Sequence, residues 1–177
     1  MVASTALIQW EVRLHDEETF GRYVIGAYPG LLRRARLLLG DHGHAEDLVQ
    51  VSLELLYGHW RRVRQPDAYV RTVMARKVIG LRARRWNNEL PTDPLPESAA
   101  EADSVSDFEL NASVRQALMA LPAEQRAVLV LRYFDDCPEA EIASTLGCSI
   151  GTVKSRAARA LAALRESGLL AEEGQLR

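Results

Sequence analysis

One short stretch, Glu139–Arg165, constrains the fold of this chain more than any other part of it. Its apolar residues recur at helical spacing on both sides of Gly147, which predicts two helices joined by a tight corner, because glycine readily takes the left-handed conformation that ends a helix. Ser149 follows as the expected N-cap of the second helix. Small Ala143, Gly147 at the corner and apolar Val153 meet the steric needs of a helix-turn-helix.

The second of these helices has a polar face that contains hydroxyl and guanidinium groups and no acid. On a helical wheel of about 100° per residue, this face gathers Thr152, Ser155, Arg156 and Arg159. Such side chains suit a DNA groove, where they donate hydrogen bonds to base edges and phosphates. The corner, the cap and the acid-free face together favour DNA binding over the alternative, an ordinary αα-hairpin with a solvated basic face.

The composition of the whole chain favours a helical protein, and its charged residues are separated into blocks along the sequence. Hydrophobic residues make up 47% of the 177 residues and aromatic residues only 6%, a balance typical of helical packing rich in Ala, Leu and Arg. The formal net charge of −2 would by itself argue against a nucleic-acid partner. However, residues 61–85 are basic with the single acid Asp67, and the charged residues of 88–110 are all acidic. This segregation indicates a charged partner.

The two cysteines, Cys137 and Cys148, give no support to a metal site, because they do not form a CxxC pair. Structural packing is the favoured role for Cys148 at the corner. The chain has no apolar run of about 18 residues and no signal-peptide pattern at its N-terminus. These features predict a soluble, cytoplasmic protein with reduced cysteines, no metal and no cofactor.

Apolar periodicity and proline positions divide the chain into two small helical domains and a linker. Residues 18–87 are predicted to form a three-helix domain, and residues 106–168 a second helical domain that contains the helix-turn-helix. Residues 88–105, rich in proline and acids, predict a flexible acidic linker. The terminal segments are an N-terminal extension, 1–17, and a C-terminal tail, 169–177.

Several local features can be predicted within this layout. Pro29 is expected to kink or break the first helix, Gly40 to close it, and Pro66 to begin the third. The N-terminal residues 8–14 alternate between apolar and polar, a strand-like period typical of an arm or of a weakly ordered leader. In the second domain, the helix after Pro122 is expected to bury Val128, Leu131 and Phe134.

Four motifs, taken in order, resemble a known family. They are Leu39–Gln50 (LGDHGHAEDLVQ), Pro66–Met74 (PDAYVRTVM), Leu121–Arg132 (LPAEQRAVLVLR) and Glu141–Arg156 (EIASTLGCSIGTVKSR). Their order and spacing are similar to those of bacterial extracytoplasmic-function (ECF) sigma factors of the sigma-70 family, of the actinobacterial type. The last motif alone is less specific, because LuxR-type regulators carry a similar helix pair.

The resemblance implies an all-α protein, with sigma region 2 in the first domain and sigma region 4 in the second. It implies a dissociable subunit, not an enzyme, that binds core RNA polymerase through the β′ clamp and the β flap. That subunit would direct the polymerase to the −35 and −10 elements of promoter DNA and help to open the duplex. An anti-sigma factor is a further implied partner, and no membrane insertion is expected.

The resemblance also assigns residues to three surfaces. The core polymerase contact maps onto an acidic helix face, for which a solvated surface is the alternative: Glu46, Asp47, Gln50 and Glu54. The −10 recognition and melting surface maps onto Arg61, Arg62, Arg64, Tyr69, Arg71, Arg76, Lys77, Arg84 and Arg85. The −35 reader maps onto Thr152, Lys154, Ser155, Arg156 and Arg159. Melting needs cations that bind phosphates and aromatic side chains on which unstacked bases can stack. The candidates for stacking are Trp60, Tyr69 and Trp86, and the alternative for each is a packing role at the edge of the core.

Three other functions stay open at this point. A LuxR-type regulator would bind operators without the polymerase, and an interaction protein would only sequester a regulator. A metal-dependent hydrolase would use Asp41, His42, His44 and Glu46, but a spacing of two places neighbouring histidines poorly on one helical face. His44 also stands where relatives often have Asp or Asn, so the helix near Ala45 is expected to lack a strong cap.

Overall fold

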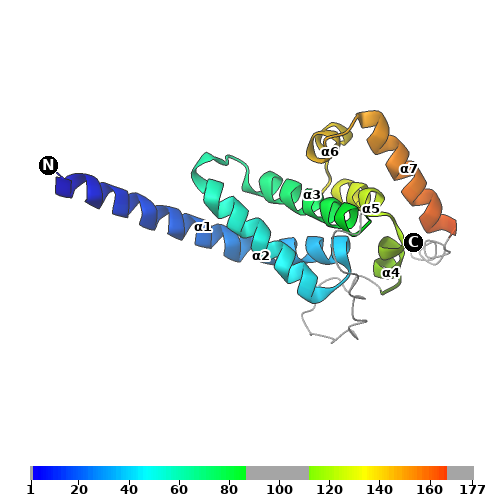
Figure 1. Cartoon of the computed structure of the whole chain (residues 1–177), viewed down its shortest axis with the longest axis horizontal. Helices are drawn as coiled ribbons and strands as arrows, with labels where there is room; N and C mark the ends of the chain where they lie inside the picture. Colours follow the sequence, from blue (N-terminus) through cyan, green and yellow to red (C-terminus); the bar gives the residue numbers. More distant parts are fainter. Residues whose placement is uncertain (1, 87–111, 167–177) are drawn as a thin grey trace, which may run out of the picture.

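The computed structural model describes the backbone of residues 2–86 and 112–166 and the side chains of residues 16–80 and 114–166. All regular secondary structure in these residues is helical (Figure 1), which confirms the predicted all-α fold. None of the helices in this part of the chain combines the length and the apolar character needed to cross a membrane. The predicted linker, 88–105, and tail, 169–177, lie outside the described residues, so the domain boundaries stay predictions.

The first lobe consists of four helical segments, α1 (Val2–Leu39), α2 (His42–His59), the 3₁₀ turn η1 (Trp60–Arg62) and α3 (Pro66–Trp86). The expected break at Pro29 is wrong, because α1 continues through it. A proline inside a helix removes one backbone hydrogen bond, but residues on both sides of Pro29, such as Tyr23 and Leu31, pack on the same core. The strand-like alternation near the N-terminus is also misleading, because α1 includes residues 2–15.

The start of α2 differs from the expectation of a weak cap. Asp41 is the N-cap, and its Oδ1 accepts a hydrogen bond from the backbone N–H of His44 at 2.8 Å. The Nδ1 atom of His44 lies 2.7 Å from the same oxygen. These bonds satisfy a donor that the first turn of a helix otherwise leaves without a partner. His44 therefore strengthens the cap that it was expected to weaken.

The second lobe consists of α4 (Ala112–Ala120), α5 (Ala123–Leu129), the π-helical turn η2 (Val130–Phe134), α6 (Glu139–Leu146) and α7 (Ile150–Glu166). Its helix-turn-helix confirms the predicted corner and cap. Gly147 has a φ of 64°, in the left-handed region, and Ser149 Oγ accepts a hydrogen bond from the backbone N–H of Thr152 at 3.1 Å. Val128 and Leu131 are buried as predicted, but Phe134 is exposed. The extra residue in the π turn rotates Phe134 away from the core.

The cores of the two lobes are continuous. One cluster of buried apolar residues includes Leu38 and Val70 of the first lobe together with Leu121 of the second. α3 contacts α2 on one side and both α5 and α6 of the second lobe on the other (Figure 1). At the corner between α1 and α2, a Cβ atom on Gly40 would lie 2.5 Å from Sδ of Met119 on α4. The lobes therefore pack closely against each other.

Candidate DNA and polymerase interfaces

The predicted −35 reader lies on the outer face of α7. Val153, Ala157 and Ala160 are buried on the inner face of this helix, so the polar residues of the opposite face point away from the core. Ser155 Oγ donates to the Thr152 carbonyl at 3.0 Å, and Arg159 Nε donates to the Ser155 carbonyl at 3.2 Å. These bonds lie within one helix surface, where both side chains are exposed. The outer face is therefore ordered by its own short-range bonds and open to a ligand.

Two basic residues of this helix have acidic partners within the second lobe. Arg156 Nη2 lies 2.6 Å from Oε2 of Glu124 at the start of α5, and only 18% of the Arg156 side chain is exposed. Lys154 Nζ lies 3.6 Å from Oε2 of Glu139 on α6. The sequence pattern did not reveal Glu124 as a partner, because it is distant along the chain and no local spacing connects it to α7.

Some residues of the predicted −10 surface are exposed to solvent, and others are bound to neighbouring side chains. Arg62 and Arg64 are exposed beside η1. Arg61 is also exposed but forms an ion pair with Asp16 of α1. Tyr69 is half-buried, with its hydroxyl 3.2 Å from Nδ1 of His59. The side chains of Arg84, Arg85 and Trp86, at the end of α3, lie outside the described residues.

Trp60 has the surroundings of a core-edge aromatic. Its ring centroid lies 5.2 Å from that of Phe20 and 5.5 Å from that of Tyr23 on α1. Its Nε1 donates a hydrogen bond to Thr19 Oγ1 at 3.2 Å. The indole ring and its N–H thus contact three residues of α1, which favours a packing role over base stacking.

Two of the cations in the middle of α3, Arg71 and Arg76, make side-chain contacts with the second lobe. Arg71 forms an ion pair with Glu141 of α6, and 14% of its side chain is exposed. Arg76 Nε donates to the Thr145 carbonyl at 2.7 Å, near the end of α6. Lys77 is half-buried. The structure therefore separates Arg62 and Arg64, which are exposed near η1, from Arg71 and Arg76, which contact α6, and of these two Arg76 is itself exposed.

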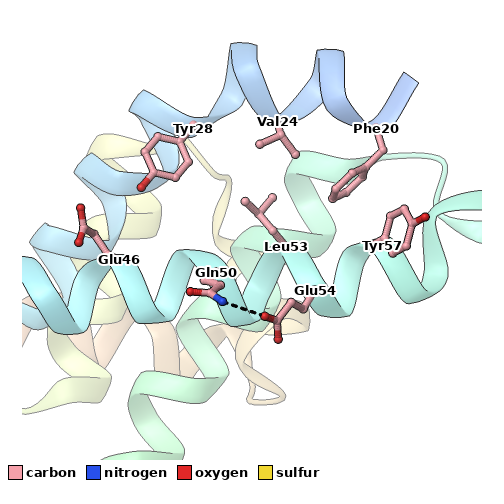
Figure 2. Close-up of a pocket in the computed structure, with 8 residues that line it drawn as sticks. All are labelled: Phe20, Val24, Tyr28, Glu46, Gln50, Leu53, Glu54 and Tyr57. Atoms are coloured by element: carbon pink, nitrogen blue, oxygen red, sulfur yellow. Dashed lines mark hydrogen bonds between the residues drawn. The ribbon is translucent and has the colours of Figure 1, made fainter. Parts of the chain in front are cut away.

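The predicted polymerase contact borders an apolar groove between α1 and α2. Figure 2 shows side chains of α1 on one side of this groove facing side chains of α2 on the other. The groove has a volume of about 660 Å³ and is lined by Phe20, Val24, Tyr28, Glu46, Gln50, Leu53, Glu54 and Tyr57. Gln50 Nε2 donates to Glu54 Oε1 at 3.1 Å, and Asp47 is exposed on the same helix without lining the groove. The polar edge thus lies beside an apolar floor.

The α1 wall of the groove was missed at the sequence level. Phe20, Val24 and Tyr28 recur at intervals of four residues, the spacing of one helix face, and that signal could have identified them. Their long helix also carries core residues on the neighbouring face, such as Tyr23 and Leu31. The residues of these two helix faces are interleaved in the sequence, so the face that lines the groove was not recognised as a separate surface.

The histidines of the hydrolase alternative are engaged in capping and helix-surface contacts. His42 Nδ1 lies 3.5 Å from Glu46 Oε1, and His44 contacts Asp41 as described above. The backbone N–H and ring of His44 hold the pKa of the Asp41 carboxyl below its usual range, against a smaller opposing effect of burial. Across residues 16–80 and 114–166, no three His, Cys, Asp or Glu side chains are grouped so that they could hold a metal ion.

Comparison with known proteins gives one family match and several relatives. Residues 111–164 match the protein family described as "Sigma-70, region 4". The chain is 40% identical over 154 residues to the RNA polymerase sigma-E factor of Streptomyces coelicolor, covering 83% of this chain and 84% of that protein. It is 35% identical over 145 residues to the ECF RNA polymerase sigma factor SigL of Mycobacterium tuberculosis, covering 76% of this chain and 80% of that protein.

The fold also resembles solved structures. The sigma factor RpoE, in its co-crystal structure with the anti-sigma factor NepR from Bartonella quintana, aligns with a TM-score of 0.65 and 25% identity, covering 86% of this chain and 97% of that one. CnrH, solved in complex with the cytosolic domain of CnrY, aligns with a TM-score of 0.59 and 24% identity. These likenesses extend over both lobes.

Proposed function

Because this chain belongs to the ECF sigma factors, and is an RNA polymerase sigma factor that directs transcription initiation and not an enzyme, we propose how its surfaces divide that work. α7 reads the −35 duplex. The surface formed by η1 and α3 contacts the −10 element and helps to open it. The groove between α1 and α2 binds core RNA polymerase.

The observation that carries the −35 proposal is the outer face of α7, which is basic and has no acid before Glu166 at the end of the helix. Thr152, Lys154, Ser155, Arg156 and Arg159 are its candidate DNA contacts. A bidentate arginine contact to a base edge contributes about 1–3 kcal/mol of discrimination. Arg156 is the candidate for such a contact, and DNA has to compete with Glu124 for its guanidinium.

The −10 proposal rests on the concentration of cations around η1 and along α3. Arg62 and Arg64 are exposed where a separated strand can approach, and Arg61 lies beside them with a surface ion pair to Asp16. Surface ion pairs contribute only about 0–1 kcal/mol, so a phosphate competes well for Arg61. The remaining candidates on this surface are Tyr69, Arg71, Arg76, Lys77, Arg84 and Arg85.

The polymerase proposal rests on the chemistry of the groove. An apolar floor with Glu46 and Glu54 on its edge fits an amphipathic helix that has an apolar stripe and basic flanking residues. We assign that helix to the β′ clamp of the core enzyme, with Asp47 and Gln50 as further polar contacts. The β flap is the proposed partner of the second lobe.

Two further assignments follow from the relatives. The sigma factor RpoE was solved with the anti-sigma factor NepR, and this likeness over both lobes supports an anti-sigma factor as a partner of this chain. Because bacterial RNA polymerase and chromosomal promoters share the cytoplasm, cytoplasmic localisation is proposed as well.

The test is reconstitution of the full chain with core RNA polymerase on genomic DNA, followed by mapping of transcript starts. We expect co-elution with the core enzyme and a set of starts that share −35 and −10 sequences. Arg156→Ala is expected to reduce these transcripts. Arg165→Ala is the matched control, because Arg165 is exposed on α7 but lies about 2.5 turns beyond Arg156 and on the opposite side of the helix from it. Absence of co-elution and of new starts would contradict the proposal.

A further inference from the structure

The N-terminal half of α1 is tied to the segment that connects α2 to α3. This segment, residues 60–67, contains η1 and the beginning of α3. Near one end of the segment, Asp16 of α1 forms an ion pair with Arg61. At the other end, the Tyr23 hydroxyl donates a hydrogen bond to Asp67 Oδ1 at 2.9 Å. α1 therefore holds the connecting segment close to both of its ends.

Trp60 adds a third tie between α1 and this segment. Its ring packs against two aromatic rings of α1, and its Nε1 donates to Thr19 Oγ1. Because Trp60 precedes Arg61 in the chain, this packing fixes the backbone from which the Arg61 side chain projects. Burial and the Asp67 carboxylate raise the pKa of Tyr23 above its usual value, so its hydroxyl stays a hydrogen-bond donor at neutral pH. The connecting segment thus has a fixed shape.

The contact between Asp16 and Arg61 leaves the outer edge of the guanidinium available. Asp16 Oδ2 accepts its hydrogen bond from Nε of Arg61. Arginine has further N–H donors on its two Nη atoms, in a planar fork that matches a phosphate. Neither Nη atom of Arg61 forms a hydrogen bond with residues 16–80 or 114–166, and 61% of its side chain is exposed. A phosphate can therefore bind the Nη groups while Asp16 stays bound to Nε.

The two members of this pair differ in their exposure to solvent. Only 23% of the Asp16 side chain is exposed, so the carboxylate lies on the inner side of the pair and the guanidinium on the outer side. Both residues line a cavity of about 360 Å³ beside η1, and exposed Arg62 lines it as well. A strand that passes this cavity meets Arg61 in an orientation that the acid behind it has already set.

From this geometry we propose that Asp16 is a positioning residue for the −10 contact, which holds Arg61 so that its Nη groups bind a phosphate of the separated strand. The inference rests on the proposed −10 role of Arg61. Asp16 acts through Arg61 and does not touch the DNA. Fixing the side chain before binding reduces the conformational entropy that binding has to remove. The proposal assigns the end of the predicted N-terminal extension, 1–17, to the −10 surface.

A competing role for Asp16 predicts an effect of the opposite sign. An acid that only competed with DNA for Arg61 would weaken binding, so its removal would strengthen the complex. Glu124 is such a competitor in the −35 proposal, because it contacts Nη2 of Arg156, a group that DNA needs. Asp16 contacts Nε instead and leaves the Nη groups to the phosphate. Removal of the Asp16 carboxylate is therefore expected to weaken DNA binding.

The test uses the full chain assembled with core RNA polymerase and a labelled single-stranded oligonucleotide that carries the −10 sequence of a promoter mapped by reconstitution. Fluorescence anisotropy measures the affinity of this oligonucleotide for Asp16→Ala, Arg61→Ala and the double variant. Glu17→Ala is the matched control, because Glu17 is an exposed acid next to Asp16 that forms no ion pair within the described part of the chain. Both acid-to-alanine changes alter the net charge equally. Surface plasmon resonance measures the affinity of each variant for the core enzyme.

We expect Asp16→Ala to weaken oligonucleotide binding about threefold, a size within the range of a surface ion pair. The double variant should bind no more weakly than Arg61→Ala alone, because Asp16 acts only through Arg61. Asp16→Asn should retain most of the affinity, because its amide oxygen still accepts the hydrogen bond from Nε. Glu17→Ala should not weaken binding. The affinity for core enzyme should stay unchanged in every variant, whereas a merely structural role of Asp16 in α1 would weaken that contact too.

The proposal is overturned if Asp16→Ala leaves binding unchanged or strengthens it, if Asp16→Asn is as weak as Asp16→Ala, or if the losses of the two single variants add in the double variant. If Arg61→Ala weakens binding and Asp16→Ala does not, positioning is rejected and the −10 assignment of Arg61 stands. If Arg61→Ala has no effect, and Arg62→Ala with Arg64→Ala has none either, the −10 assignment itself is rejected, and positioning is rejected with it.

Discussion

The guanidinium of Arg156 lies 2.6 Å from the carboxylate of Glu124, and this ion pair joins α7, the proposed −35 reader, to the first turn of α5. About half of the Glu124 side chain is exposed, so water screens this pair. In the proposed complex, promoter DNA has to compete with Glu124, which is bound to Arg156 before DNA arrives. The bond also orients the guanidinium at the edge of the reading face, which limits the rotamers that binding has to fix.

Changes at these two positions should have opposite effects on −35 binding. Arg156→Ala is expected to weaken binding of the −35 duplex by about 1–3 kcal/mol, because it removes a base-edge contact. Glu124→Gln should strengthen binding, because it removes a competing anion and leaves Arg156 in place. Titration of a labelled duplex from a mapped promoter measures both affinities. Equal affinity of Arg156→Ala and the unchanged chain would exclude Arg156 from the reading set.

The N-cap of α2 gives the stability of the chain a predictable dependence on pH. The folded-state pKa of Asp41 is depressed by the hydrogen bonds from His44. The carboxylate therefore stabilises the folded state above its unfolded pKa, about 3.9, and this contribution is lost as the pH falls through the folded pKa. Asp41→Ala should lower the free energy of unfolding by about 0.5–2 kcal/mol near neutral pH.

Urea denaturation at near-neutral and at acid pH measures this effect. The difference between Asp41→Ala and the unchanged chain should shrink in acid, as protonation removes the ionised cap from the unchanged chain. Asp41→Asn is the control, because asparagine is also a good N-cap but does not titrate. A difference that stays constant down to acid pH would show that the ionised carboxylate is not the source of the stabilisation.

The parts of the fold that depend on local pattern could be predicted from the sequence. The corner at Gly147 and the cap at Ser149 need only a left-handed glycine and a hydroxyl at the right position, and both are present in the structure. The acidic face of α2 likewise follows from helical spacing and borders the groove. Local propensity was misleading at Pro29, where packing of α1 on both sides outweighs one missing backbone hydrogen bond.

Contacts between distant segments could not be predicted in the same way. Arg71 was assigned to the −10 surface, but no spacing rule connects it to Glu141, which lies 70 residues away along the chain. The same holds for Arg34 and Asp135, which are separated by 101 residues. Charge patterns show that a cation needs a partner, and only the packing of helices determines whether that partner is DNA or another helix of the same chain.

Arg126 of α5 links α5 to the end of α4. Its side chain is buried, and its Nη1 lies 3.2 Å from the Leu118 carbonyl and 3.4 Å from the Met119 carbonyl. These carbonyls are among the last of α4, and the Leu118 carbonyl also accepts a hydrogen bond from the backbone N–H of Leu121 at 3.1 Å. Arg126→Met should lower the free energy of unfolding by about 1.5–3 kcal/mol, because a charged donor is removed. Urea denaturation measures the loss, and a smaller loss in Arg126→Lys, which keeps a donor, is the expected control result.

The groove between α1 and α2 predicts a charge-dependent contact with the core polymerase. Glu54 lies on its edge beside apolar Leu53 and Tyr57 (Figure 2). Glu54→Lys should raise the dissociation constant for core enzyme about tenfold, equivalent to about 1.4 kcal/mol, because it repels a basic edge of the incoming helix. The loss should be greater at low salt and arise largely from slower association, as expected for a charge at the rim of an interface.

Surface plasmon resonance with immobilised core enzyme measures both rate constants for this variant. Glu18→Lys is the matched control, because Glu18 is an exposed acid of α1 that does not line the groove and whose ion pair, within the described part of the chain, is with Arg22 of its own helix, at 4.0 Å. Both substitutions change the net charge by the same amount, so a general electrostatic effect would weaken both variants equally. A specific contact at the groove should weaken only Glu54→Lys. Leu53→Ala should then accelerate dissociation without changing the salt dependence, because it removes buried apolar area and no charge.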